Sequence, residues 1–302
     1  MIDPKDMEHC REAIRHGSLS FHAASRLLPA RVRDPALALY AFCRLADDEV
    51  DLSCAKHAAV DDLQERLELV YRGKPRNGPA DRAFTSVIEM FDMPRALPDA
   101  LLEGLAWDAE MRRYDDLSAL TDYSARVASA VGVMMCVLMK VRDRHALARA
   151  ADLGVAMQLT NIARDVGEDA LEDRLYLPLE WLEHAGIDPE AFVSGPQGTK
   201  AVRAMVKRLL IEAERLYVRS EAGIGALPVT VRPGIFAARF IYAAIGTRLR
   251  SMGHDSISSR AYTSKAQKLG LASWSLVRSG ATIVMPTSPM IHAKALPETQ
   301  FL

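Results

Sequence analysis

Two segments of the chain place carboxylates at helical spacing within otherwise apolar sequence. In the first, ALALYAFCRLADDEVDL, polar side chains follow one another at steps of 4, 3, 1 and 3, at Tyr40, Arg44, Asp47, Asp48 and Asp51. In the second, LGVAMQLTNIARDVGED, the steps are 3, 4 and 4, at Gln158, Asn161, Asp165 and Asp169, with Glu168 alongside. At about 3.6 residues per turn, each set lies along one narrow face of a helix. We name these sets the first and the second acidic stripe.

The apolar flanks of both stripes predict buried helices, because a surface helix has a wide polar face. Buried carboxylates are costly without partners, so each stripe requires basic side chains or metal. Mg²⁺ suits such a site, because it binds one or two carboxylates and completes its octahedron with water and phosphate oxygens. Mn²⁺ is an alternative. One D-x-x-x-D motif is more often a solvated helix face, whereas two copies on apolar helices favour facing stripes around a metal-bound diphosphate.

The elements around the stripes are predicted to be helices. Helix-period apolar patterns recur along the chain and strand-like alternation is scarce, which predicts an all-α fold. Without a repeat or a long linker, one domain over residues 1–280 is the simpler interpretation. We expect the helix of the first stripe to start with Asp34 as N-cap and Pro35 at N1. Residues 281–302, with three prolines and weak periodicity, are predicted to form a flexible tail.

Composition argues against several classes of protein. The formal net charge is −1 with both signs spread along the chain, so no nucleic-acid partner is expected. The N-terminus lacks an apolar signal region, and no C-x-x-C pair is formed by Cys10, Cys43, Cys54 and Cys136. We therefore expect reduced thiols and a cytoplasmic protein. The longest apolar run is shorter than the roughly 20 residues that span a bilayer.

The two stripes resemble the aspartate-rich motifs of the squalene/phytoene synthase family. The family motifs are close to C-R-x-x-D-D-x-x-D and Q-x-x-N-I-x-R-D-x-x-E-D, and this chain reads CRLADDEVD and QLTNIARDVGED. Similarity continues in RLYLP after the second stripe, in HGSLSFHAASRLLP upstream, in YSARVASAVGVMM, and in residues 242–268. The resemblance covers about residues 8–270.

This resemblance implies an isoprenoid-synthase-type helical bundle with a central cavity, and a transferase that ionises an allylic prenyl diphosphate. The allylic cation adds to the C2–C3 double bond of a second prenyl diphosphate, and the resulting cyclopropyl diphosphate ionises again and rearranges. Carried over to this chain, the metal and diphosphate ligands are Asp47, Asp48, Asp51, Asn161, Asp165 and Asp169. Tyr123, in the YSARVASAVG segment, is a further candidate catalytic residue.

The resemblance also indicates groups that could bind the substrate: Ser18, Ser20, Phe21, Tyr40, Arg44, Gln158, Asn161, Arg164, Tyr242, Arg260 and Lys265. Some of them have equally good structural interpretations. Arg44 could form a salt bridge within the first stripe, and Arg260 and Lys265 could be surface cations. The histidines do not add a zinc site, because His16 and His22 fit no common zinc spacing.

The motifs leave the chain length of the substrate open. Small side chains in residues 127–139 and at Ala23, Ala24 and Ser25 favour C20 geranylgeranyl diphosphate if they line the cavity, but tight helix packing would explain them as well. Overall similarity favours the carotenoid-forming branch of the family, which needs no NADPH. The alternatives are a squalene- or dehydrosqualene-type enzyme that uses C15 farnesyl diphosphate, a chain-elongating prenyltransferase, and a non-catalytic assembly factor.

Peripheral contact with the inner membrane is a further expectation. It rests on a product too apolar to remain in water and on apolar residues near the C-terminus: Ile283, Val284, Met285, Met290 and Ile291. None of these features determines the oligomeric state.

Overall fold

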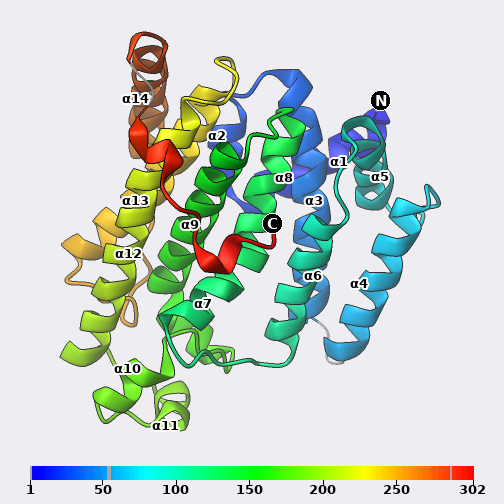
Figure 1. Cartoon of the computed structure of the whole chain (residues 1–302). Helices are drawn as coiled ribbons and strands as arrows, with labels where there is room; N and C mark the ends of the chain where they lie inside the picture. The colour runs from blue at the N-terminus through cyan, green and yellow to red at the C-terminus, as the bar shows by residue number, and fades with distance from the viewer. Residues whose placement is uncertain (1, 53–55, 286–287) are drawn as a thin grey trace.

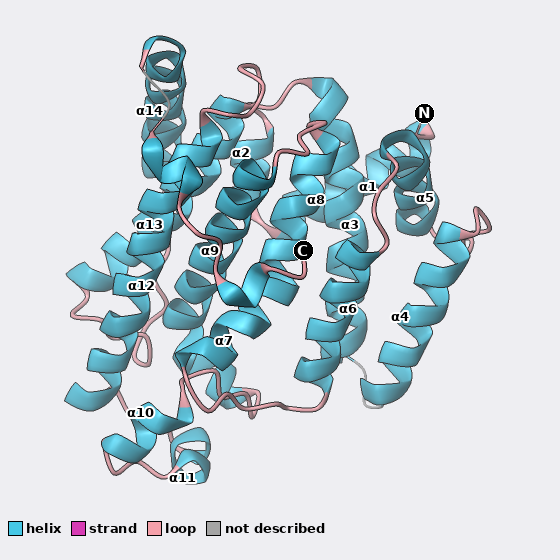
Figure 2. Ribbon diagram, viewed as in Figure 1, coloured by secondary structure: helices cyan, strands magenta, loops and turns pink. Residues whose placement is uncertain are grey.

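The computed structural model describes residues 2–52, 56–285 and 288–302, which form helices and loops without a strand (Figure 1, Figure 2). The all-α prediction is confirmed. The first helices are α1 (Pro4–Gly17), α2 (Leu19–Ser25), α3 (Ala30–Leu52), α4 (Lys56–Tyr71), α5 (Pro79–Phe91), α6 (Ala96–Ala109), α7 (Leu117–Ser124) and α8 (Ala130–Leu138). The later helices are α9 (Arg144–Leu171), α10 (Leu179–His184), α11 (Pro189–Ser194), α12 (Lys200–Ile224), α13 (Arg232–Ser251) and α14 (Lys265–Val284). A π-helix joins α7 to α8, and two 3₁₀ turns follow α14: η1 (Ala125–Ser129), η2 (Pro289–His292) and η3 (Pro297–Thr299).

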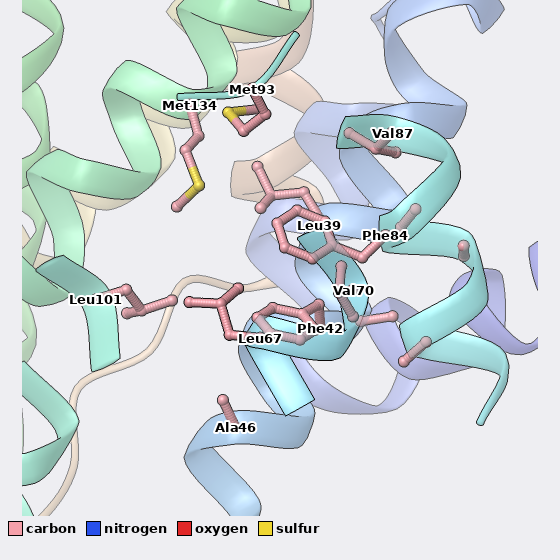
Figure 3. Close-up of a cluster of buried hydrophobic side chains, with 14 of the residues drawn as sticks. Leu39, Phe42, Ala46, Leu67, Val70, Phe84, Val87, Met93, Leu101 and Met134 are labelled. Carbon is pink, nitrogen blue, oxygen red and sulfur yellow. The ribbon is translucent and has the colours of Figure 1, made fainter. Parts of the chain in front are cut away.

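Helix α3 has one face in a core cluster and another toward a cavity. Leu39, Phe42 and Ala46 point into a buried cluster with side chains of α4, α5, α6 and α8 (Figure 3). The rings of Phe42 and Phe84 stack with 4.3 Å between centroids. Burial of each large apolar side chain contributes roughly 1.5–3 kcal/mol. This packing fixes the rotation of α3, so that Arg44, Asp47 and Asp51 of the first stripe face the cavity.

The start of α3 differs from the prediction. The helix begins at Ala30 and Pro35 lies inside it, so the predicted N-cap at Asp34 is wrong. Pro35 lacks the N–H that would donate to a carbonyl oxygen one turn earlier. The preceding turn is nevertheless helical, because the Arg33 N–H donates to the Pro29 carbonyl oxygen at 2.8 Å.

Helix α9, which includes the second stripe, runs through the centre of the bundle (Figure 1). It packs against α12, α13, α8 and η1. A Cβ on Gly154 would lie 2.5 Å from the Cα of Ser129 in η1, so any larger residue would push the two helices apart. The Ser129 hydroxyl donates to the Ala151 carbonyl oxygen at 2.7 Å. Small residues therefore hold η1 against α9.

The C-terminal residues expected to form a flexible tail are packed onto the bundle. Residues 288–302 contact α7, α9 and α12 (Figure 1). The buried Arg149 guanidinium donates to the carbonyl oxygens of Met290 and Ala293 at 2.8 and 3.0 Å. Its charge is balanced by Asp152 at 2.7 Å. The packing differs from the expectation because its partner, Arg149, lies 141 residues earlier in the chain than Met290.

The cysteines are consistent with the expected thiols as far as the structure describes them. Cys10, Cys43 and Cys136 are free. Cys54 lies outside the described residues.

Candidate active site

A cavity of about 950 Å³ lies between helices α2, α3, α6, α8, α9, α12 and α13. Both acidic stripes line it, so the cavity expected from the resemblance is present. Its acidic lining comes from α3, α6, α9 and the residue after α9, and consists of Asp47, Asp51, Asp108, Asp165, Glu168, Asp169 and Glu172. Carboxylates from three separate helices therefore face one cavity.

The carboxylates of the first stripe are paired with arginines. Arg44 bridges Asp47 at 3.2 Å and Asp48 at 2.6 Å, and Arg174, from the loop after α9, pairs with Asp51. Burial and the neighbouring charge of Asp51 raise the pKa of Asp47 to about 6, although Arg44 opposes this shift. Arg44 thus forms the salt bridge considered for it and also lines the cavity.

The second stripe has one firmly paired carboxylate and one without an ion pair. Asp165 lies between two guanidinium groups. The Nε atom of Arg164 donates a hydrogen bond of 2.7 Å to its carboxylate, and the Nε atom of Arg260 donates one of 2.9 Å. Arg260 also pairs with Glu168 at 3.1 Å. Among the described basic residues, none forms an ion pair with Asp169. Burial and the charge of Asp165 raise the pKa of Asp169 to about 8.

A third acidic element, Asp108 on α6, was not identified from the sequence. Its carboxylate accepts hydrogen bonds from the Tyr123 and Tyr176 hydroxyls at 2.8 and 2.7 Å. Burial raises the pKa of Asp108 to about 6 despite these bonds. Its charge in turn raises the pKa of Asp47 and of Asp169, so Asp108 is close to both stripes.

Most of the residues expected in the site line the cavity. They are Ser18, Ser20, Phe21, Tyr40, Arg44, Asp47, Asp51, Tyr123, Gln158, Asn161, Arg164, Asp165, Asp169, Tyr242 and Arg260. Asp48 and Lys265 are not part of the lining. Lys265 is exposed at the start of α14, and Lys268, one turn later, lines the cavity in its place. Burial lowers the pKa of Lys268.

The oxygen donors of the two stripes fit a hard divalent cation. The Oδ1 atom of Asn161 is buried and has no hydrogen-bond partner among the described residues. It lies one helical turn before Asp165, and Mg²⁺ prefers such amide and carboxylate oxygens. Within the described parts of the chain, no three acidic, histidine or cysteine side chains are arranged to hold a metal alone. The residues therefore suit a metal that takes its other ligands from water and substrate phosphates.

The rest of the cavity has apolar walls that include small side chains. Ala128 and Gly132, from η1 and α8, line it together with Ala24 and Ser25 of α2, whereas Ala23 does not. Ser129 of η1 packs on Gly154 of α9. Both interpretations of the small residues therefore hold, for different residues of the same segment.

Comparisons with known proteins assign this geometry to a family. The squalene/phytoene synthase family model matches residues 14–267. The chain belongs to the squalene/phytoene synthase family. It is 59% identical over 305 residues to the phytoene synthase of Rhodobacter capsulatus, covering 100% of this chain and 90% of that protein. It is 56% identical over 312 residues to the phytoene synthase of Cereibacter sphaeroides, covering 100% of this chain and 88% of that protein.

A solved structure of the squalene/phytoene synthase family shares the fold. A dehydrosqualene synthase in complex with a ligand matches with a TM-score of 0.84 at 30% identity, over 92% of this chain and 97% of that chain. The predicted isoprenoid-synthase-type bundle is therefore confirmed. The chain is an enzyme of the transferase class, and its curated relatives support phytoene synthase function. The family acts on prenyl diphosphates and generally uses a divalent metal.

Proposed function

We propose that this squalene/phytoene synthase condenses two molecules of geranylgeranyl diphosphate head to head, through prephytoene diphosphate, to phytoene. Two diphosphates are released, and the product enters carotenoid biosynthesis. The observation that supports this reaction most directly is one cavity of about 950 Å³ that has both carboxylates and apolar side chains in its lining. The names of the relatives at 56–59% identity support the same reaction.

The metal in this proposal is Mg²⁺, which Mn²⁺ could replace. Its ligands are Asp47, Asp51, Asn161, Asp165 and Asp169. Bound Mg²⁺ supplies Lewis-acid stabilisation of the charge that develops on the leaving diphosphate. Support comes from the raised pKa values of Asp47 and Asp169, because carboxylates crowded together in a buried site favour a cation between them.

The basic and hydroxyl side chains near the stripes bind the diphosphate oxygens. Arg44, Arg164 and Arg260 each have five N–H donors, so donors remain beyond those that pair with carboxylates. Smaller donors in the lining are Ser18, Ser20, Tyr40, Gln158 and Tyr242. Phe21 packs between Tyr40 and Tyr242, with ring centroids 6.4 and 5.0 Å away. This aromatic wall keeps water from the start of the hydrocarbon chain.

Tyr123 acts in this proposal as an oriented dipole, because its one O–H donates to Asp108 and its oxygen lone pairs remain to stabilise positive charge. Its hydroxyl is held by Asp108 at 2.8 Å. Burial and the charge of Asp108 raise the pKa of Tyr123 well above its ordinary value. The phenol therefore stays protonated at neutral pH and stabilises charge without acting as a base.

The test is incubation of the purified protein with Mg²⁺ and either geranylgeranyl or farnesyl diphosphate, each with and without NADPH, followed by chromatography of the hydrocarbons. A C40 product with a central triene, formed without NADPH, is the expected result. A C30 product would move the enzyme to the farnesyl-using branch, which the structural match to a dehydrosqualene synthase makes the second candidate. No hydrocarbon from either substrate would contradict the proposed catalysis.

A further inference from the structure

Helix α14 has a continuous apolar face that is exposed to solvent. Leu269, Leu276 and Ile283 are 71%, 54% and 63% exposed, and they follow one another at intervals of seven residues. Val277 and Val284 flank this row and are 60% and 85% exposed. At 3.6 residues per turn, positions seven and eight apart lie on the same side of a helix. The face therefore extends along most of α14.

The other side of α14 is firmly attached to the bundle. Ser275 and Ser279 are buried, and α14 packs along α13. Arg278 pairs with Glu221 of α12 at 3.2 Å. The helix lies at the outer edge of the molecule (Figure 1), so its apolar face is presented outward by a fixed scaffold.

The sequence around α14 has a strong local excess of positive charge. Residues 256–297 contain no aspartate or glutamate and five basic residues, Arg260, Lys265, Lys268, Arg278 and Lys294. Arg260 and Arg278 pair with carboxylates of α9 and α12, so the uncompensated charge of the described residues here is that of the three lysines. The whole chain has a formal net charge of −1, so this segment differs sharply from the average. An apolar helix face with flanking cations and exposed aromatic residues is typical of helices that lie in a membrane interface. The aromatic residues here are Tyr262 and Trp274, which are 74% and 52% exposed.

The exposed face adjoins the opening of the cavity. Tyr262 and Lys268 both line the cavity, and they stand just before α14 and in its first turn. Leu19 on α2 also lines the cavity while 59% exposed, and α2 packs against α14. A surface that covered α14 would therefore also cover the mouth of the cavity.

We infer that α14 is a membrane-docking helix that lays the mouth of the cavity on an anionic bilayer surface. Within the described residues, no helix is long and apolar enough to cross a membrane, so α14 lies in the interface. A second copy of the chain fits this face less well, because a symmetric dimer repeats the same residues on both sides, and residues 256–297 contain no acidic residue to complement Lys265 and Lys268. The idea that hydrocarbon chains pass between the cavity and the lipid rests on the proposed function. The docking of α14 on the bilayer does not depend on the proposed function.

This inference changes the surface expected to contact the membrane. Ile283, Val284 and Met285 remain exposed at the end of α14. Ile291 is only 7% exposed and is held in the packed C-terminal segment, so it is not available for membrane contact. The docking surface is therefore one face of a helix, and Ile291 is not part of it.

Vesicle co-sedimentation of the full chain, without substrate, tests the inference. The vesicles are phosphatidylcholine alone or phosphatidylcholine with phosphatidylglycerol. The variant L276S/V277S/V284S removes three apolar side chains from the docking face. The matched control, I211S/V218S, changes two residues of α12 that are 57% and 48% exposed. Circular dichroism and turnover of detergent-dispersed substrate show whether each variant is folded.

The wild type and the control are expected to bind the anionic vesicles, more weakly at high salt, and the α14 variant to lose at least about tenfold in binding. Equal binding by the α14 variant and the wild type would overturn the inference. A wild-type protein that does not bind vesicles would also overturn the inference. This includes a wild type that forms a dimer in solution, if the α14 variant converts that dimer to a monomer. Because no substrate is present, failure here is distinct from failure of the proposed reaction.

Discussion

The two acidic stripes face the same cavity but differ in how their charge is compensated. In the second stripe, Asp165 has two arginine partners and Asp169 has no ion pair among the described residues. In the first stripe, both Asp47 and Asp51 have one arginine each. The pKa of Asp169 accordingly rises to about 8 and that of Asp47 only to about 6. The comparison indicates that positive charge is most lacking beside Asp169, where a metal would be stabilised most.

The largest effect is expected when either stripe loses a principal carboxylate. Asp47→Asn and Asp165→Asn should each abolish turnover, with losses well beyond the roughly 10–100-fold that partners of metal ligands typically cost. Helix content by circular dichroism should be unchanged. Near-normal activity in either variant would show that its stripe does not take part.

A smaller loss of activity is expected when Asp108 loses one of its two hydrogen bonds from tyrosine hydroxyls. Tyr176→Phe should lower kcat by roughly 10–100-fold, because Asp108 would lose one of its two donors. Tyr114→Phe is the matched control, since the Tyr114 ring packs on Tyr123 but its hydroxyl has no hydrogen-bond partner among the described residues. Equal losses in both variants would point to packing of the aromatic cluster and not to Asp108.

The stripes should also differ in how pH affects stability without metal. Because the pKa of folded Asp169 is about 8 and its ordinary value is 3.8, the folded state keeps a proton that the unfolded state has lost. The stability due to this proton is fully present below pH 4 and is lost as pH rises to about 8. The Asp169→Asn variant has no carboxyl group here and does not lose this stability as pH rises. In EDTA near pH 8, its Tm should therefore exceed the wild-type Tm by on the order of several °C.

Thermal scans between pH 4 and 9 measure this difference. The advantage of Asp169→Asn should grow up to about pH 8 and then level off. The corresponding advantage of Asp47→Asn should level off near pH 6, because the pKa of Asp47 is about 6. A constant difference across this range would mean that neither carboxylate has a raised pKa.

The smallest effect is expected at Asp48. This residue pairs with Arg44 at 2.6 Å but does not line the cavity. Exposed ion pairs contribute about 0–1 kcal/mol, so Asp48→Asn should change kcat/KM less than about fivefold. A loss as large as that of Asp47→Asn would place Asp48 among the metal ligands.

The sequence predicted the parts of the site that repeat along one helix. Regular steps between Asp47 and Asp51, and between Asp165 and Asp169, are visible without a structure because helical spacing alone puts them together. The all-α fold followed from the same periodicity. Lys265 and Lys268 show the limit of this reasoning, since both fit the basic segment and only the rotation of α14 decides which one lines the cavity.

The parts that were missed depend on tertiary contacts. Asp108, in the segment LLEGLAWDAE, belongs to no D-x-x-x-D motif, and its only local signal in the sequence was a carboxylate in a mostly apolar helix. Its partner Tyr176 lies 68 residues later, in the RLYLP segment whose similarity was noted without a role for the tyrosine. Arg174, in the same segment, reaches Asp51 across 123 residues. No spacing rule joins residues this far apart.

The central claim is that the two stripes form one metal-dependent diphosphate site, and calorimetric titration tests it most directly. Mg²⁺ is titrated into the wild type, Asp47→Asn and Asp165→Asn, each with and without a non-ionisable thio analogue of geranylgeranyl diphosphate. We predict strong Mg²⁺ binding to the wild type only when the analogue is present, and loss of that binding in both variants. Undiminished analogue-dependent Mg²⁺ binding in either variant would contradict a shared site.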